Sequence, residues 1–141
     1  KKEYTVLVHG SPAKDEGSIS LAIGRAASGD KMAARAEAME GDRTALTHYR
    51  VEEKFPHAAL LKVWTETGRT HQIRAHFKAL GCPVVGDPLY VLKQGARVSA
   101  PRLFLHAKML GFNHPKTGEW MQFETPLPKD LADFLKSLQK K

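Results

Sequence analysis

The sequence contains a single cysteine, Cys82, among 141 residues. One cysteine excludes an intramolecular disulfide and a cysteine-based zinc site, and it fits a reducing compartment such as the cytoplasm. No apolar run approaches the roughly 20 residues of a membrane-spanning helix, and no signal peptide is visible, so we expect no membrane partner. A nucleophile elbow, a P-loop and a dinucleotide-binding glycine motif are also missing, so the residues do not indicate these common enzyme classes.

Acidic residues are scarcer than basic ones, with 15 Asp and Glu against 22 Lys and Arg, which gives a net charge of +7. Such a surplus points to a polyanionic partner, nucleic acid first, or serves solubility alone. The hydrophobic content of 42% excludes a disordered composition. A chain of this length fits one domain with a real core.

Hydrophobic periodicity predicts an α+β domain built on a mostly antiparallel mixed sheet with flanking helices. The predicted strands cover residues 3–8, 18–23, 45–55, 58–65, 103–113 and 119–124, with a short strand at 84–85, and the helices cover 70–80 and 128–138. Residues 86–101 are expected to form a loop. Residues 25–43 have a poor apolar pattern and predict a mobile basic loop, with a short helical turn within 31–40.

The segment from Glu66 to Tyr90 contains the clearest functional signals. Its predicted helix places Ile73, Phe77 and Leu80 on an apolar face, and Gly81 supplies the stop. The basic residues His71, Arg74 and Lys78 are expected along the other side. A strand that ends in a glycine turn and leads into a helix presents free backbone N–H groups, which together with Arg69 suit a bound anion such as phosphate.

The seven histidines do not form a metal-binding pattern. His71 and His76 point about 140° apart on a helix, so they cannot share an ion. His106 and His114 stand at opposite ends of a predicted strand. We expect no metal site and no metal-dependent hydrolysis.

Four motifs resemble those of the RluA-type pseudouridine synthases, which modify ribosomal and transfer RNA. The sequence TGRTHQIR at 67–74, followed by GDPLY at 86–90, matches the signature of that family closely. Residues 1–10 resemble its strand with an active-site tyrosine, and ALTHY at 45–49 resembles another of its strands. LHA at 105–107, with FNHP at 112–115, resembles its late hairpin. The resemblance extends over nearly the whole chain.

This resemblance implies an RNA uridine isomerase that needs no cofactor. In the family, the N-glycosidic bond of uridine breaks and C5 of the base joins C1′ of the same ribose. An aspartate in an Arg-Leu-Asp motif starts the reaction, and this sequence contains no such motif. The resemblance therefore implies that residues 1–141 are the C-terminal part of a catalytic domain and are inactive alone.

The resemblance also assigns roles to individual residues. Arg74 and Tyr4 match catalytic positions, with Arg74 pairing with the absent aspartate and Tyr4 stacking on the target base. Ile73 and Leu105 match residues that line the uracil pocket, and Arg69 and His71 match positions that contact RNA or hold the turn. Without the aspartate, Arg74 is expected to face solvent or another anion.

The residues by themselves leave other interpretations open. Arg74 fits a solvated helix face, Tyr4 a core aromatic and His71 a structural histidine. Asp87 fits a role in bracing its own turn, which is typical of Gly-Asp-Pro, and Tyr90 fits packing beneath that turn.

Two further functions compete with the enzyme: a non-catalytic RNA-binding remnant and a structural protein with a coincidental basic face. If a segment is missing, we expect an exposed apolar surface near Tyr4, open to that segment or to a second copy.

Overall fold

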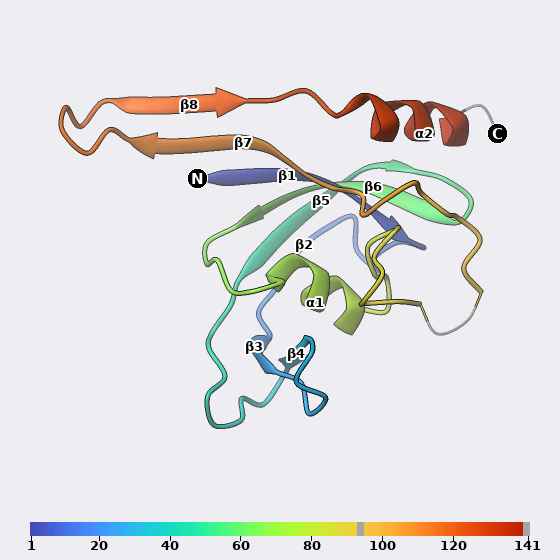
Figure 1. Cartoon of the computed structure of the whole chain (residues 1–141), viewed down its shortest axis with the longest axis horizontal. Coiled ribbons are helices and arrows are strands. Elements are labelled where there is room, and N and C mark those ends of the chain that lie inside the picture. Colours follow the sequence, from blue (N-terminus) through green and yellow to red (C-terminus); the bar gives the residue numbers. More distant parts are fainter. Residues whose placement is uncertain (93–94, 140–141) are drawn as a thin grey trace.

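The computed structural model describes residues 1–92 and 95–139, so positions 93 and 94 of the predicted loop lie outside the described residues. A six-stranded sheet runs in the order β2-β5-β6-β1-β7-β8, and all adjacent strands in it are antiparallel. Two helices flank the sheet (Figure 1), which confirms the predicted α+β class. The sheet strands are β1 (Lys2–His9), β2 (Glu16–Ile19), β5 (Thr47–Lys54), β6 (Ala58–Thr65), β7 (Leu105–Asn113) and β8 (Trp120–Glu124).

Strand β1 lies inside the sheet, paired with β6 on one side and β7 on the other. Its residues Val6, Leu7 and Val8 have no exposed surface. Successive side chains on a strand point to opposite faces, so these residues serve two cores. Val6 and Val8 pack in the cluster that contains Phe77 of α1 (Gln72–Ala79), whereas Leu7 packs with Leu131 of α2 (Lys129–Gln139).

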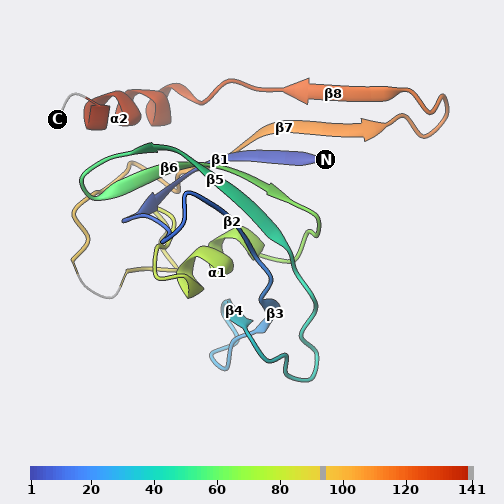
Figure 2. The same ribbon diagram turned by 180° about the vertical axis from the view of Figure 1, so that it is seen from behind.

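The two helices therefore cover opposite faces of the sheet, as the two views in Figures 1 and 2 show. In α1, Ile73 and Phe77 are buried as predicted, and Gly81 with a φ of 83° follows the helix end. Leu80 was expected on the same apolar face but lies beyond the helix and is 43% exposed. That expectation was wrong because the helix ends one residue earlier than the apolar pattern indicates.

The region between β2 and β5 differs most from the sequence prediction. The strand predicted at 18–23 is split between β2 and a separate strand, β3 (Ala22–Arg25). Within the predicted loop, β4 (Met32–Arg35) pairs with β3 in a small second sheet that lies near α1. The expected helical turn is therefore wrong at its start, because backbone pairing with β3 overrides the helix propensity of the alanine-rich segment.

The predicted short strand at Val84 and Val85 is reduced to a bridge between Val84 and Val8. Its backbone still extends the central pairing, because Val85 N–H donates to the Leu7 carbonyl and Phe104 N–H donates to the Val85 carbonyl. Because Val85 immediately precedes the GDPLY segment, this pairing places the segment next to the C-terminal part of β1.

The β7–β8 hairpin extends beyond the rest of the sheet (Figure 1). Leu110, Phe112 and Phe123 are exposed on it, and the rings of Phe112 and Phe123 stack with centroids 5.9 Å apart. Tyr4, Leu110 and Phe123 line one cavity, so the expected exposed apolar surface near Tyr4 is present. In the part of the chain that the structure describes, no helix is long and apolar enough to span a bilayer.

Replacement of Gly86 by alanine tests the packing beneath the GDPLY turn. Gly86 has a φ of 82°, and a Cβ there would lie 2.1 Å from the Arg102 carbonyl oxygen. We expect Gly86→Ala to lower the free energy of unfolding by roughly 3 kcal/mol, since strain and a backbone clash add. Gly118→Ala is the matched control, because Gly118 has a φ of 75° with open space around it, and it should cost only about 1 kcal/mol. If urea unfolding showed the same loss of unfolding free energy for both variants, the proposed clash at Gly86 would be contradicted.

Candidate active site

All six residues singled out from the sequence line one pocket of about 220 Å³. They come from the central strand β1, the turn after β6, the helix α1 and the start of β7. They are Tyr4, Arg69, His71, Ile73, Arg74 and Leu105. The pocket lies on the α1 side of the sheet, because Tyr4, Ile73 and Leu105 belong to or pack against the core cluster on that side. The fold thus brings together residues that are up to 101 positions apart, from Tyr4 to Leu105.

Arg74 is held by Asp87 in a bidentate ion pair. Its Nε donates to Asp87 Oδ2 and its Nη2 donates to Oδ1, both at 2.8 Å. The Asp87 side chain has no exposed surface, and that of Arg74 is 17% exposed. The anion that Arg74 was expected to face is therefore Asp87 of the GDPLY motif.

Asp87 also braces its own turn, as the sequence suggested. Its Oδ1 accepts the backbone N–H groups of Leu89 at 2.9 Å and Tyr90 at 3.0 Å. Burial by itself would raise the pKa of Asp87, but the hydrogen bonds from Arg74, Tyr90 and Leu89 outweigh it, so its pKa lies below the ordinary value. The carboxylate is ionised at neutral pH with its oxygens engaged by four N–H donors.

Tyr90 is buried beneath this turn, as expected, and joins three segments. Its ring lies 5.0 Å from the Arg74 guanidinium carbon, a cation–π arrangement. Its hydroxyl accepts the Met32 N–H of β4 at 2.7 Å and is hydrogen bonded to His71 Nδ1 at 2.9 Å. His71 has a φ of 52°, and burial together with the Arg74 charge lowers its pKa. His71 thus holds the turn and lines the pocket at once.

Gln72 organises the turn before α1, a role that sequence reasoning missed. Its Oε1 accepts the Thr67 hydroxyl at 2.7 Å and the Arg69 N–H at 3.0 Å, and its Nε2 donates to the Thr47 hydroxyl at 2.9 Å. Arg69 Nε donates to the Thr44 carbonyl. These bonds use donors that were expected to bind an anion, so the helix start offers fewer free groups than the sequence indicated. The available signal was a glutamine inside the motif at the first helical position.

Tyr4 is partly buried on β1 and packs against the core cluster on the α1 side. Burial raises the pKa of its phenol, so the hydroxyl is neutral near pH 7. An aromatic ring at the wall of a pocket, with its hydroxyl protonated, can stack on a base and donate a hydrogen bond.

Among the residues that the structure describes, the buried titratable side chains His76 and Cys82 do not form a second site of this kind. His76 is fully buried and is hydrogen bonded to the Thr47 hydroxyl and the Leu21 carbonyl. His71 is hydrogen bonded to a different group, the Tyr90 hydroxyl. Within residues 1–92 and 95–139, no group of three or more His, Cys, Asp or Glu could hold a metal ion. Burial raises the pKa of Cys82 to about 11, so it is a protonated thiol.

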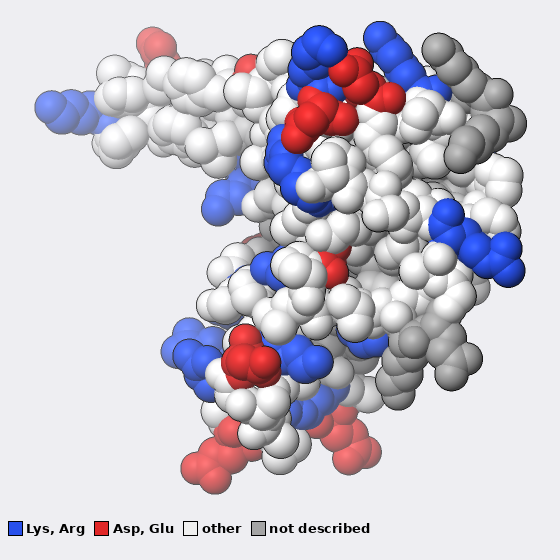
Figure 3. All heavy atoms as spheres, turned by 45° about the vertical axis from the view of Figure 1, so that its right-hand side comes forward, with Lys and Arg blue, Asp and Glu red and all other residues white. Residues whose placement is uncertain are grey.

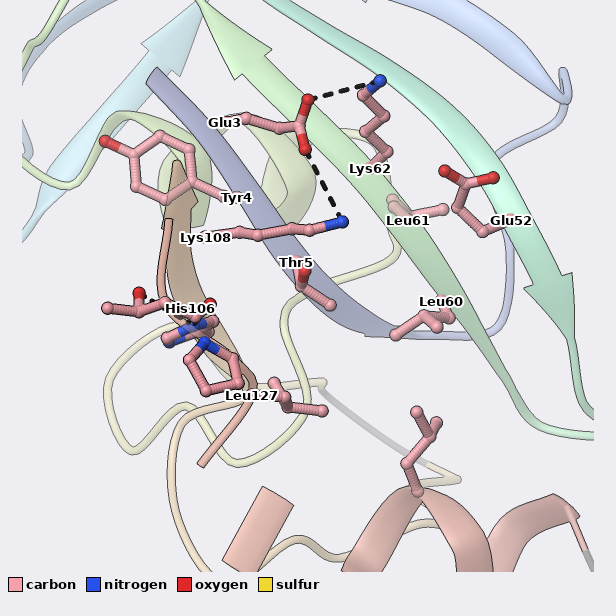
Figure 4. A pocket seen from close by; sticks show the side chains of 13 residues that line it. Glu3, Tyr4, Thr5, Glu52, Leu60, Leu61, Lys62, His106, Lys108 and Leu127 are labelled. Atoms are coloured by element: carbon pink, nitrogen blue, oxygen red, sulfur yellow. Dashed lines mark hydrogen bonds and ion pairs between the residues drawn. The ribbon is translucent and has the colours of Figure 1, made fainter. Parts of the chain in front are cut away.

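A larger cavity of about 350 Å³ lies on the opposite, α2 side of the sheet. Figure 4 shows Glu3 between Lys62 and Lys108, with carboxylate-to-ammonium distances of 3.2 and 3.9 Å. Glu52 also lines the cavity, so its two acidic side chains balance the two ammonium groups, and leucines such as Leu60 and Leu127 complete the lining. Of the six residues that line the first pocket and were singled out from the sequence, only Tyr4 also lines this cavity.

On the face that Figure 3 shows, basic side chains are spread out rather than gathered in one patch. On the face in Figure 3, Lys and Arg side chains occur from the upper arm to the lower lobe and alternate with acidic ones. Lys78, predicted on the basic side of the helix, donates to the Val91 carbonyl at 2.6 Å. Positive charge near the pocket therefore comes mainly from Lys2, Arg69 and Arg74, which line it.

The Arg74–Asp87 pair makes a stability prediction. Asp87→Ala leaves a largely buried guanidinium without its partner, so we expect a loss on the order of 3 kcal/mol in the free energy of unfolding. Asp130→Ala is the control, because Arg102 and Asp130 form the same two-bond pair with side chains 48% and 46% exposed, and its effect on the free energy of unfolding should be much smaller.

The same pair predicts a pH dependence. The pKa of Asp87 is depressed in the folded protein, so its contribution to stability is complete above the unfolded value of about 3.9 and is lost as pH falls through the folded value. The stability gap between the unmodified chain and Asp87→Asn should therefore shrink below about pH 4 in urea unfolding series. A gap that is constant from pH 7 to pH 3 would contradict this linkage.

Comparison with known proteins connects this chain to one enzyme family. The family model described as RNA pseudouridylate synthase matches residues 1–79. An RNA pseudouridine synthase of Bacillus subtilis (YlyB) is 41% identical over 99% of this chain, and one of Chloroflexus aurantiacus is 44% identical over 99%. The dual-specificity RNA pseudouridine synthase RluA of Pasteurella multocida is 38% identical over 89%.

Solved structures agree with these sequence relatives. Human RNA pseudouridylate synthase domain containing 1 superimposes with a TM-score of 0.76 and 28% identity, over 99% of this chain and 66% of that one. The chain matches 44%, 42% and 57% of the lengths of the three bacterial relatives, so it spans about half the length of the curated relatives it matches. With the family model matched over more than half of its residues, the chain belongs to the RluA-like RNA pseudouridine synthase family.

Proposed function

We propose that this chain supplies the arginine and tyrosine part of an active site that isomerises uridine to pseudouridine in ribosomal or transfer RNA. The observation that carries the proposal is the single pocket in which Tyr4, Ile73, Arg74 and Leu105 meet. Ile73 and Leu105 provide apolar walls for a uracil, and Tyr4 provides a ring on which the base can stack. The relatives' names support the RNA class, since one is a ribosomal large subunit synthase and another is dual-specific.

The pocket has cations but no carboxylate of its own. Among the described residues that line it there is no Asp or Glu. Asp87, which lies behind Arg74, has its oxygens engaged by four donors and is not available as a nucleophile. We therefore propose that residues 1–141 act as the C-terminal part of a catalytic domain, that the reacting aspartate comes from a further segment, and that the chain alone is inactive. No cofactor enters the proposed reaction.

Arg74 is suited to receive that aspartate. The ion pair with Asp87 uses Nε and Nη2, so within the described part of the chain Nη1 carries no assigned hydrogen bond. A guanidinium can hold a second carboxylate in place and keep it ionised. Arg69 and His71 also line the pocket, and we propose that they contact the RNA backbone. The protein is proposed to work in the cytoplasm.

An activity assay tests this function. The purified chain and the same chain extended upstream by its gene should be incubated with total ribosomal and transfer RNA, and pseudouridine counted after RNA digestion. We expect product only from the extended protein, and Arg74→Ala should reduce its rate at least 100-fold, since one transition-state interaction of this kind is worth about 3 kcal/mol.

Other results of this assay have defined meanings. Product from the short chain would refute the proposed need for a further aspartate. No product from either protein would refute the enzyme and favour the RNA-binding remnant, for which salt-dependent RNA binding by the chain is the remaining test.

The exposed hairpin face is proposed to pair with the aspartate-bearing segment or, in its absence, with a second copy. Leu110 and Phe123 line a cavity together with Tyr4, so a segment packed there would lie beside the active-site pocket. We expect the isolated chain to self-associate at high concentration, and Phe112→Ser with Phe123→Ser to weaken this about tenfold or more, because each removes an exposed ring. A monodisperse monomer in analytical ultracentrifugation would contradict this expectation.

A further inference from the structure

We propose that Asp87 is a positioning residue for the reaction, in that it fixes the Arg74 guanidinium so that its remaining edge serves the pocket; this inference rests on the proposed function. Asp87 itself does not line the pocket, whereas Arg74 does. Any effect of Asp87 on a bound uridine must therefore pass through Arg74.

Asp87 is fixed by the backbone rather than by its side chain alone. Its Oδ1 accepts the N–H groups of Leu89 and Tyr90 in the turn that follows it, and the Gly86 backbone lies against the Arg102 carbonyl. The carboxylate cannot rotate without breaking these bonds. A buried, immobile carboxylate that takes two bonds from one guanidinium imposes both the position and the plane of that group.

A second contact fixes the guanidinium from its face. The Tyr90 ring lies 5.0 Å from the Arg74 guanidinium carbon. The ring is itself held at its hydroxyl by Met32 of β4 and by His71. The GDPLY motif thus restrains both the edge and the face of the Arg74 guanidinium. Its Asp87 stands 13 residues after Arg74, and the motif contributes no residue to the lining of the pocket.

This restraint matters because an arginine side chain has many rotamers. Holding a catalytic group in its reactive geometry lowers the barrier by removing that freedom in advance, and a displacement of about 1 Å can cost about 100-fold in rate. In α1 alone, Arg74 would be a solvated helix residue with four flexible torsions. Asp87 converts it into a rigid donor directed by two segments of the chain.

The first test measures the order of Arg74 in this chain, without any activity. In a ¹⁵N-labelled sample, the Nε–H signal of Arg74 should exchange slowly with water, and its assignment follows from its loss in Arg74→Lys. Asp87→Asn should abolish this protection. The control Asp130→Asn should change only the Arg102 signal, because Asp130 makes the same pair with Arg102 at the surface. Retained protection of Arg74 in Asp87→Asn would overturn the proposal, whatever the enzyme does.

The second test measures single-turnover pseudouridine formation by the upstream-extended protein. Asp87→Asn should lower the rate roughly 100-fold with an RNA Kd changed by no more than about twofold. In an Arg74→Lys background the same substitution should change the rate by less than about threefold, because its target is gone. Asp130→Asn should leave rate and Kd unchanged. If Asp87→Asn does not fold, Asp87→Glu keeps the charge with one more methylene and should show an intermediate loss.

The outcomes separate this inference from the proposed function. A 100-fold loss that persists in the Arg74→Lys background would show that Asp87 acts by another route and would overturn the positioning role. If the unmodified extended protein makes no pseudouridine, the proposed function fails, and the exchange of the Arg74 signal still decides whether Asp87 positions this side chain.

Discussion

The buried carboxylate of Asp87 is the constraint on which the pocket depends. An ionised group without exposed surface is costly unless its hydrogen bonds are complete, and Asp87 has four donors from a helix side chain and a turn backbone. Satisfying it joins α1 to the GDPLY turn. Tyr90 in that turn also accepts a hydrogen bond from the Met32 N–H of β4. The turn therefore links the small β3–β4 sheet to the helix.

Strand β1 divides the molecule into two chemical faces. Alternate residues point to opposite sides, so Tyr4 and Val6 belong to the face of α1, whereas Leu7 belongs to the face of α2. On the α2 side, Glu3 is neutralised by Lys62 and Lys108. On the α1 side, Arg74 is paired with Asp87, whereas Lys2 and Arg69 line the pocket without an ion pair to any described residue. The pleat of a single strand therefore separates the motif-lined pocket from the cavity on the α2 side.

The sequence predicted the structure best where the pattern of apolar residues was clear. Strand β6 coincides with the predicted 58–65, and Ile73 and Phe77 are buried as their spacing indicated. It failed at β3 and β4, because strands of four residues carry little pattern, and alanine favours a helix when no partner is considered. The role of Gln72 was missed because its partners, Thr47 and Thr67, are set by tertiary contacts.

The motifs identified the family and six of the residues that line the pocket, because the order and spacing of residues around a turn are local properties of the chain. Only the tertiary structure showed that Arg74 already has a partner in Asp87 and that this carboxylate is fully buried. That pairing joins two segments through a long-range hydrogen-bonding geometry. Residue types and spacings specify which groups can meet, but the packing of β1, α1 and the turn decides which of them do.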